Sequence, residues 1–176
     1  LTRIDMNIFF LDKDPLRASS MYGDKHVGKL IVEVAQMCST ALHRHGLHDE
    51  APYKSAYEKH PMTIWVGDSV ANFEWAVSHG MGLGNQWHNR FGTAHKGIDA
   101  LCEISVVALS NKIVDSFPQF DFTVPPQCMP DEYKQDGGTL DDTIMGYKRY
   151  YTFAKTKMHK WSKTNKPKFI EEVHNA

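Results

Sequence analysis

The stretch DKHVGKLIVEVAQMCSTALHRH, residues 24–45, predicts one long helix that packs against several neighbours. At about 100° per residue its apolar side chains fall on a single arc, which is typical of a helix packed on a core. That arc is made of Val27, Leu30, Ile31, Val34, Met37, Cys38 and Ala41. Small residues on a third side, Gly28, Ala35 and Ser39, allow another backbone to approach closely. We therefore expect neighbours on more than one side of this helix.

A polar stripe runs along the remaining side of the same helix. Its members recur three or four positions apart and are His26, Lys29, Glu33, Gln36, Thr40 and His43. We interpret this line of mixed donors and acceptors as one wall of a polar pocket, and as the main sign of chemistry in this chain. The alternative is an exposed helix edge with pairs such as Lys29 and Glu33.

Composition favours one globular domain over residues 1–176, since a chain of this length with 41% hydrophobic residues can bury a single core. The formal net charge of −1 excludes a strong overall field, so a nucleic-acid site must be local. Three cysteines without a CxxC pair suit a reducing cytoplasm. No apolar run is long enough for a membrane span, so we expect a soluble protein with no membrane partner. Residues 1–5 are expected to be disordered or upstream residues, and 163–176 a basic tail.

The remaining patterns complete a mostly α fold, a bundle of about five helices with a short N-terminal β-strand. The apolar run at 7–11 predicts the strand, and Asp14-Pro15 predicts a short helix over 16–22. Further helices are expected over 69–91, 93–112 and from about 141 to beyond Trp161. A long loop rich in proline and aromatic residues, 114–138, precedes the last helix and is expected to be a lid or a hydrophobic strap.

Two further helices carry patterns that favour a nucleotide or nucleic-acid partner. In the helix over 69–91, a second polar stripe consists of Asn72, His79, Gln86 and Arg90 and could face the first. The last helix combines tyrosines with many lysines, which suits phosphates and stacked bases. The alternative is an aromatic core stripe beneath solubilising lysines.

The chain contains ten histidines, so a metal site has to be considered. No HExxH helix and no calcium-type aspartate loop is present, so no cofactor is predicted. A divalent metal is the alternative, and its ligands would be His26, Glu33, His43 and His95.

The chain resembles a family of short proteins encoded by tailed bacteriophages. The residues that carry the resemblance are Asp24-Lys25-His26, Glu33, Ala35-Gln36, Ser39-Thr40, His60-Pro61, Trp65, Asn72, Trp75, Arg90-Phe91-Gly92, His95, Met129 to Tyr133, Tyr147, Arg149 to Tyr151 and Lys155. No activity is established for the family, so the resemblance implies no catalytic roles. It implies a cytoplasmic setting in an infected bacterial host cell.

We expect an enzyme that acts on a nucleobase, nucleotide or nucleic acid by cleaving or transferring an N-glycosidic bond. Glu33 is the expected general acid or base, with His26 or His95 as its proton-transfer partner. Tyr151 is a further candidate for stacking on a base. The expected substrate-binding residues are Lys29, Gln36, His60, Trp65, Asn72, Gln86, Arg90, Asp131, Tyr150 and Lys155.

Two other classes of function stay open. A metal-dependent phosphoesterase or nuclease would use the histidine and glutamate ligands named above. A phage counter-defence module without catalysis would bind nucleic acid or a host protein.

Overall fold

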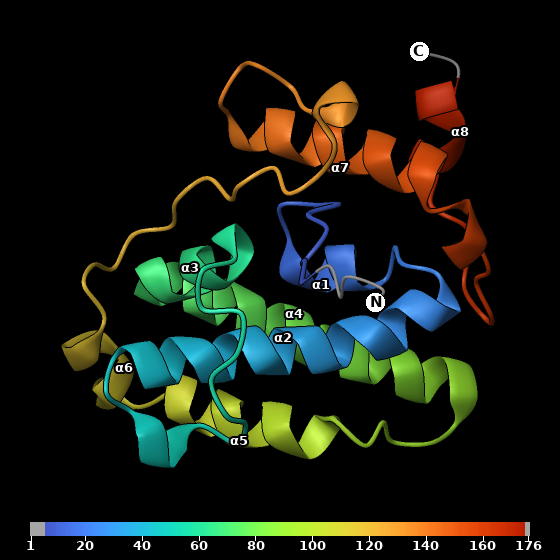
Figure 1. Ribbon diagram of the computed structural model, residues 1–176. Helices are drawn as coiled ribbons and strands as arrows, with labels where there is room; N and C mark the ends of the chain where they lie inside the picture. Colours follow the sequence, from blue (N-terminus) through green and yellow to red (C-terminus); the bar gives the residue numbers. More distant parts are fainter. Residues whose placement is uncertain (1–5, 175–176) are drawn as a thin grey trace.

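The computed structural model describes residues 6–174, and this part of the chain is helical with no strand (Figure 1). The prediction of a mostly α fold is therefore confirmed. The α-helices are α1 (Pro15–Ser19), α2 (Asp24–Arg44), α3 (Pro61–Asp68), α4 (Val70–Phe91), α5 (Ile98–Ala108), α6 (Asn111–Ser116), α7 (Leu140–Ala154) and α8 (Phe169–His174). Short 3-10 turns are η1 (His48–Glu50), η2 (Asp131–Tyr133) and η3 (Thr156–Met158).

Helices α2 and α4 form the centre of the bundle. Helix α2 packs against α3, α4 and α5, whereas α4 also contacts α1 (Figure 1). Their bounds confirm the predictions for 24–45 and 69–91 to within one residue at each end. Glycines mark the closest approaches: a Cβ on Gly28 would meet the Trp87 ring at 2.7 Å, and one on Gly80 would meet Leu101 at the same distance. The small-residue side of α2 thus receives a side chain from α4.

The predicted N-terminal strand is wrong. Residues 6–11 are completely buried, but no strand lies beside them. Phe9 has a φ of 56°, in the left-handed region, which interrupts any extended run. The segment lies between α7 on one side and α2 and α4 on the other, because Phe9 contacts His26 and Tyr150 while Phe10 contacts Trp75 (Figure 1). A short apolar run signals burial equally in a strand and in irregular chain, so periodicity could not separate the two.

Side chains replace the missing strand partners of this buried segment. The Tyr22 hydroxyl lies 3.0 Å from the carbonyl oxygen of Ile8 and 2.5 Å from that of Phe9. Asn7 accepts a hydrogen bond from the Phe9 amide at 3.2 Å and donates one to the Cys128 carbonyl at 2.8 Å. Buried backbone groups that lack partners are costly, so these bonds make the irregular path possible.

Two helices are shorter than the sequence predicts. The expected helix over 93–112 is divided into α5 and α6, because Ser110 has an extended backbone between them. The last long helix ends at Ala154, so Trp161 lies beyond it. The chain after Ala154 crosses the start of α2, where the Asp24 amide donates to the Lys160 carbonyl at 2.7 Å. The predicted basic tail includes a helix of its own, α8, which packs on α7.

The segment from 117 to 139 is irregular apart from η2, as the long-loop prediction requires. Hydrogen bonds hold both halves of this segment to the helical bundle. Asn72 and Trp65 bond to Thr123, and the Tyr147 hydroxyl accepts a hydrogen bond from the Cys128 amide at 3.0 Å. These anchors favour the strap interpretation over the lid.

Replacement of Tyr22 by Phe tests the role of its hydroxyl. Tyr22→Phe leaves the ring packing intact but removes a hydrogen-bond donor from two buried carbonyls. We expect the free energy of unfolding to fall by about 1 to 3 kcal/mol. Urea denaturation measures this loss, and the exposed Tyr57→Phe serves as the control. A Tyr22→Phe protein as stable as Tyr57→Phe would contradict this role.

Candidate functional site

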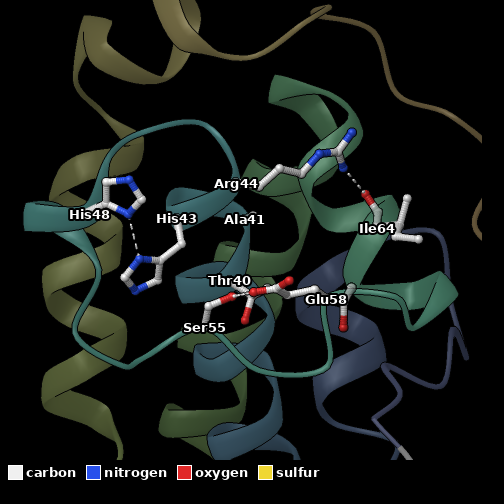
Figure 2. A pocket seen from close by; sticks show the side chains of 9 residues that line it. Thr40, Ala41, His43, Arg44, His48, Ser55, Glu58 and Ile64 are labelled. Atoms are coloured by element: carbon white, nitrogen blue, oxygen red, sulfur yellow. Dashed lines mark hydrogen bonds between the residues drawn. The ribbon is translucent and has the colours of Figure 1, made fainter.

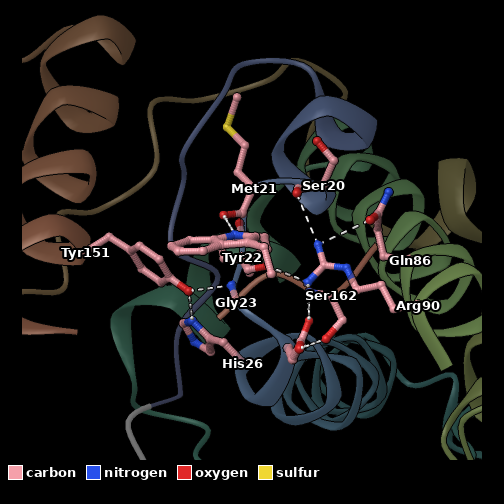
Figure 3. A network of polar contacts seen from close by, with 11 residues as sticks. Ser20, Met21, Tyr22, Gly23, His26, Gln86, Arg90, Tyr151 and Ser162 are labelled. Carbon is pink, nitrogen blue, oxygen red and sulfur yellow. Dashed lines mark hydrogen bonds and ion pairs between the residues drawn. The ribbon is translucent and has the colours of Figure 1, made fainter. Parts of the chain in front are cut away.

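A buried ion pair joins the beginning of α2 to the end of α4 (Figure 3). Arg90 donates from Nη1 to Asp24 at 3.2 Å and to the Tyr22 carbonyl at 2.7 Å. From Nη2 it donates to the Ser20 carbonyl and to Gln86 Oε1, both at 3.2 Å. Arg90 and Gln86 were both predicted to bind substrate. The Arg90 guanidinium and Gln86 Oε1 are instead hydrogen-bonded within the protein.

Asp24 also holds the chain that follows α7. Its carboxylate accepts hydrogen bonds from the Ser162 amide at 2.9 Å and the Ser162 hydroxyl at 2.6 Å. Burial by itself raises the pKa of the Asp24 carboxyl, but these bonds and the Arg90 guanidinium outweigh burial and lower it. Asp24 is therefore ionised at neutral pH, and the network of Figure 3 is structural.

His26 lies in a cage of aromatic rings next to this network. Only 1% of its surface is exposed, and its ring stacks on Tyr151 with a centroid separation of 5.4 Å. Phe9 and Tyr22 contact it edge-on. Burial, and then the nearby charges of Lys29 and Lys155, lower the pKa of His26 to about 3. The imidazole is therefore neutral at pH 7, which argues against His26 as a proton-transfer partner.

Lys29 and Lys155 both lie close enough to this buried histidine for their charges to act on it. Each has a neighbour among the predicted site residues, Glu33 and Tyr150, and we call these four residues the lysine–carboxylate cluster. Lys29 Nζ is 3.6 Å from Glu33 Oε1, and the Glu33 side chain is 5% exposed whereas that of Lys29 is 40% exposed. Lys155 Nζ lies 5.0 Å from the centre of the Tyr150 ring. Residues from α2 and from the end of α7 therefore meet at one place.

Tyr150 is less available for stacking than the sequence predicts. It is buried, with Phe9 stacked at 5.5 Å and Tyr133 tilted against it at 5.3 Å. Tyr133 is only half-buried and lies on η2, the same turn as the predicted residue Asp131. The aromatic ring available beside the cluster is therefore Tyr133, which sequence reasoning missed. Tyr133 lies on a three-residue turn next to the proline-rich loop, so no helical periodicity of the sequence marks it.

Asn72 and Trp65 were predicted to contact a base but instead hold the strap. Asn72 Nδ2 donates to the Trp65 carbonyl at 2.9 Å and to Thr123 Oγ1 at 2.8 Å, and its Oδ1 accepts from the Thr123 amide at 2.9 Å. Trp65 Nε1 donates to the Thr123 carbonyl at 3.0 Å. Both side chains are buried, and these bonds use the polar groups that a base would need.

Gln36 and His60 also bond to backbone groups. Gln36 Nε2 donates to the Lys54 carbonyl at 2.7 Å, which fastens the loop after η1 to α2. His60 caps α3 by accepting a hydrogen bond from the Met62 amide at 3.2 Å. These hydrogen bonds join Gln36 and His60 to backbone groups outside the lysine–carboxylate cluster.

His95 and Asp131 complete the predicted set. His95 Nδ1 accepts a hydrogen bond from the Gly97 amide at 2.9 Å, and its ring packs edge-on against Trp87. Trp87 covers Gly28, which lies about 160° to 200° around α2 from His26 at 100° per residue. His95 is therefore on the other side of α2 from the cluster. Asp131 is exposed and pairs with Lys134 at 2.8 Å.

The alternative metal ligands are not brought together. His26 and His43 are 17 positions apart on α2, which corresponds to about 25 Å along a helix. Among the side chains that the structure describes, which end at residue 173, no group of three or more His, Cys, Asp or Glu is placed to hold a metal ion. His43 instead pairs with His48, with their Nδ1 atoms 2.9 Å apart.

A cavity of about 350 Å³ lies at the other end of the polar stripe (Figure 2). Thr40 and His43 of α2 line it, together with Ser55, Glu58 and other residues that sequence reasoning did not select. The Ser55 hydroxyl donates to Glu58 at 2.6 Å. Thr40 Oγ1 donates to the Ala56 carbonyl at 2.9 Å, so this half of the stripe mainly holds the loop after η1.

Comparison with known proteins assigns no family to the chain: no protein-family model, curated protein or solved structure matches it. The resemblance to tailed-phage proteins therefore stays a prediction. In the described part of the chain, the helices are too short or too polar to cross a membrane.

The buried neutral His26 predicts acid sensitivity. In the unfolded chain its pKa returns to about 6.5, so the unfolded state binds more protons and stability falls as the pH drops from 6.5 towards 3. At pH 5 this one group should lower the free energy of unfolding by about 2 kcal/mol. His26→Phe keeps an aromatic ring in the cage and should lose about 2 kcal/mol less than wild type between pH 7 and pH 5.

Urea denaturation at the two pH values measures the difference. His88→Gln, at an exposed position of α4, is the matched control and should follow the wild type. Equal losses in wild type and His26→Phe would show that His26 is not held neutral.

Proposed function

We propose that this protein binds a ligand that carries both a nucleobase and a phosphate at the lysine–carboxylate cluster, and that it cleaves the N-glycosidic bond of that ligand. The observation that carries the proposal is that Lys29, with its partner Glu33, and Lys155 come from distant parts of the chain and both lie near His26. The half-buried ring of Tyr133 packs on Tyr150, the neighbour of Lys155. The lysines suit a phosphate, and the ring suits a base.

The electrostatics of the cluster support an anionic ligand. Lys29 has one carboxylate partner, Glu33, at 3.6 Å, and Lys155 lies over the rings of Tyr150 and Phe9 at 5.0 and 5.7 Å. Because His26 beneath them is neutral at pH 7, it neither adds to nor cancels their charge. The two ammonium groups and one carboxylate give a net charge of +1, which favours an anion.

Glu33 is the group proposed for the chemistry. A carboxylate next to an ammonium group can accept a proton from water as that water attacks the sugar carbon. The C–O bond forms as the C–N bond to the base breaks, and the base takes up a proton as it leaves. This role needs no cofactor. Tyr133 would hold the base, and Lys29 and Lys155 would hold the phosphate.

Binding is tested with variants that change one charge each. Lys155→Met removes the ammonium group and keeps the aliphatic stem against the rings, whereas Lys157→Met removes the same charge two residues away on η3. We expect isothermal titration calorimetry with nucleoside monophosphates to show at least about a fivefold weaker affinity for Lys155→Met and no change for Lys157→Met. Equal affinities in both variants would exclude Lys155 from the site.

Turnover is tested by chromatography of the base released from nucleotides and from short DNA. Glu33→Gln should bind within about threefold of wild type and release base at least about 100-fold more slowly. The exposed Glu58→Gln is the control for loss of a carboxylate. Full activity in Glu33→Gln would remove Glu33 from the reaction, and ligand binding without base release by wild type would replace the enzyme by a binding module.

A further inference from the structure

The last quarter of the chain carries a strong positive charge that the neutral total conceals. No acidic residue occurs between Asp142 and Glu171. The basic residues in that interval are Lys148, Arg149, Lys155, Lys157, Lys160, Lys163, Lys166 and Lys168. A local charge of this kind can attract a polyanion although the molecule as a whole cannot.

Three of these lysines line one cavity of about 440 Å³ between the end of α1 and the chain around α8. Lys148 comes from α7, whereas Lys166 and Lys168 come from the segment that precedes α8. Thr164 and Asn165 supply hydroxyl and amide groups to the same wall. The cavity therefore combines positive charge with neutral hydrogen-bonding groups.

Acidic residues offset this charge only in part. Glu172 is the one carboxylate in the cavity wall, so the lining has three positive groups against one negative group. Lys166 pairs with Glu171 at 3.1 Å, but both side chains are largely exposed and such pairs are weak. The Lys148 ammonium lies 5.6 Å from the centre of the Phe169 ring. A phosphate group can displace these weak contacts.

The cavity lies close to the lysine–carboxylate cluster. Tyr151 separates them: its ring stacks on His26 at 5.4 Å, beneath the cluster, and contacts Phe169 of the cavity wall at 6.4 Å. A ligand that reaches both places has to extend past the buried Tyr151 ring. A nucleic-acid strand meets this requirement because its phosphates repeat at regular intervals.

We propose that this cavity holds the phosphodiester backbone of a single-stranded nucleic acid, one of whose bases enters the lysine–carboxylate cluster. The inference rests on the proposed function and deepens it, since it makes the substrate a strand. A membrane surface fits less well, because Phe169, the aromatic residue of the cavity wall, is buried and cannot insert into lipid. Thr164 and Asn165 suit individual phosphate oxygens.

The test is fluorescence anisotropy with a labelled single-stranded 15-nucleotide DNA between 50 and 200 mM NaCl. The variant Lys148→Gln/Lys166→Gln/Lys168→Gln should bind more than about tenfold more weakly at 100 mM NaCl, and its slope of log K against log salt should be smaller by about 2. The control Lys54→Gln/Lys59→Gln/Lys96→Gln removes the same charge from exposed lysines elsewhere and should keep the wild-type slope.

Thermal melting first establishes that both triple variants are folded. Equal weakening in the two would overturn the inference, because net charge alone would then explain binding. Stronger binding to anionic phosphatidylserine vesicles than to DNA, lost in the same cavity variant, would also overturn it and would assign the cavity to lipid.

The two proposals can fail separately. If Lys155→Met leaves mononucleotide affinity unchanged while the cavity variant still loses DNA binding, the strand site stands and the proposed function fails. If nucleotides bind at Lys155 but the cavity variant binds DNA like the control, the inference fails and the proposed function stands.

Discussion

The hydroxyl of Tyr22 is the interaction on which the rest of the structure depends. The buried segment 6–11 has no strand partner, so its carbonyl groups must find donors among side chains. The Tyr22 hydroxyl, just before α2, lies within hydrogen-bond distance of two of these carbonyl oxygens, those of Ile8 and Phe9. This arrangement lets an irregular apolar segment serve as the layer on which α7 packs.

The consequence reaches the lysine–carboxylate cluster. Phe9 lies between His26 of α2 and Tyr150 of α7, next to the place where His26 stacks directly on Tyr151, so the segment fills the space between these two helices. The end of α7 then brings Lys155 over the ring of Phe9, near the part of α2 that carries Lys29 and Glu33. The buried segment is thus both the core of the fold and the floor of the candidate site.

The long helices could be predicted from sequence because their signals are local. Helix α2 has a clear apolar arc, and α4 has a serine cap at Ser69 followed by a regular pattern. The path of residues 6–11 could not be predicted, since a tyrosine 13 residues away supplies the hydrogen bonds. The chain that follows α7 is held by the bonds of Asp24 to Ser162, two residues that are 138 positions apart.

The same distinction between local and remote partners explains which site residues could be predicted from the sequence. Lys29 and Glu33 are neighbours on one helix turn, so their pairing follows from spacing. Arg90 and Asn72 have the residue types of a ligand site, yet their partners are backbone groups of Tyr22, Trp65 and Thr123. A polar side chain in the core needs such partners as much as a ligand-binding side chain needs its ligand. Residue type alone therefore could not separate the two, whereas the contacts of each side chain do.

His26 shows why burial decides chemical roles in this protein. Its position on the polar stripe suggests a proton donor, but the aromatic cage and two nearby lysines keep the ring neutral. A protonated His26 would add a third positive charge in a place that water does not reach, and the fold opposes that charge. His26 therefore adds no charge to the cluster at neutral pH. In the proposed site the phosphate contacts are therefore left to Lys29 and Lys155, and the proton transfer to Glu33.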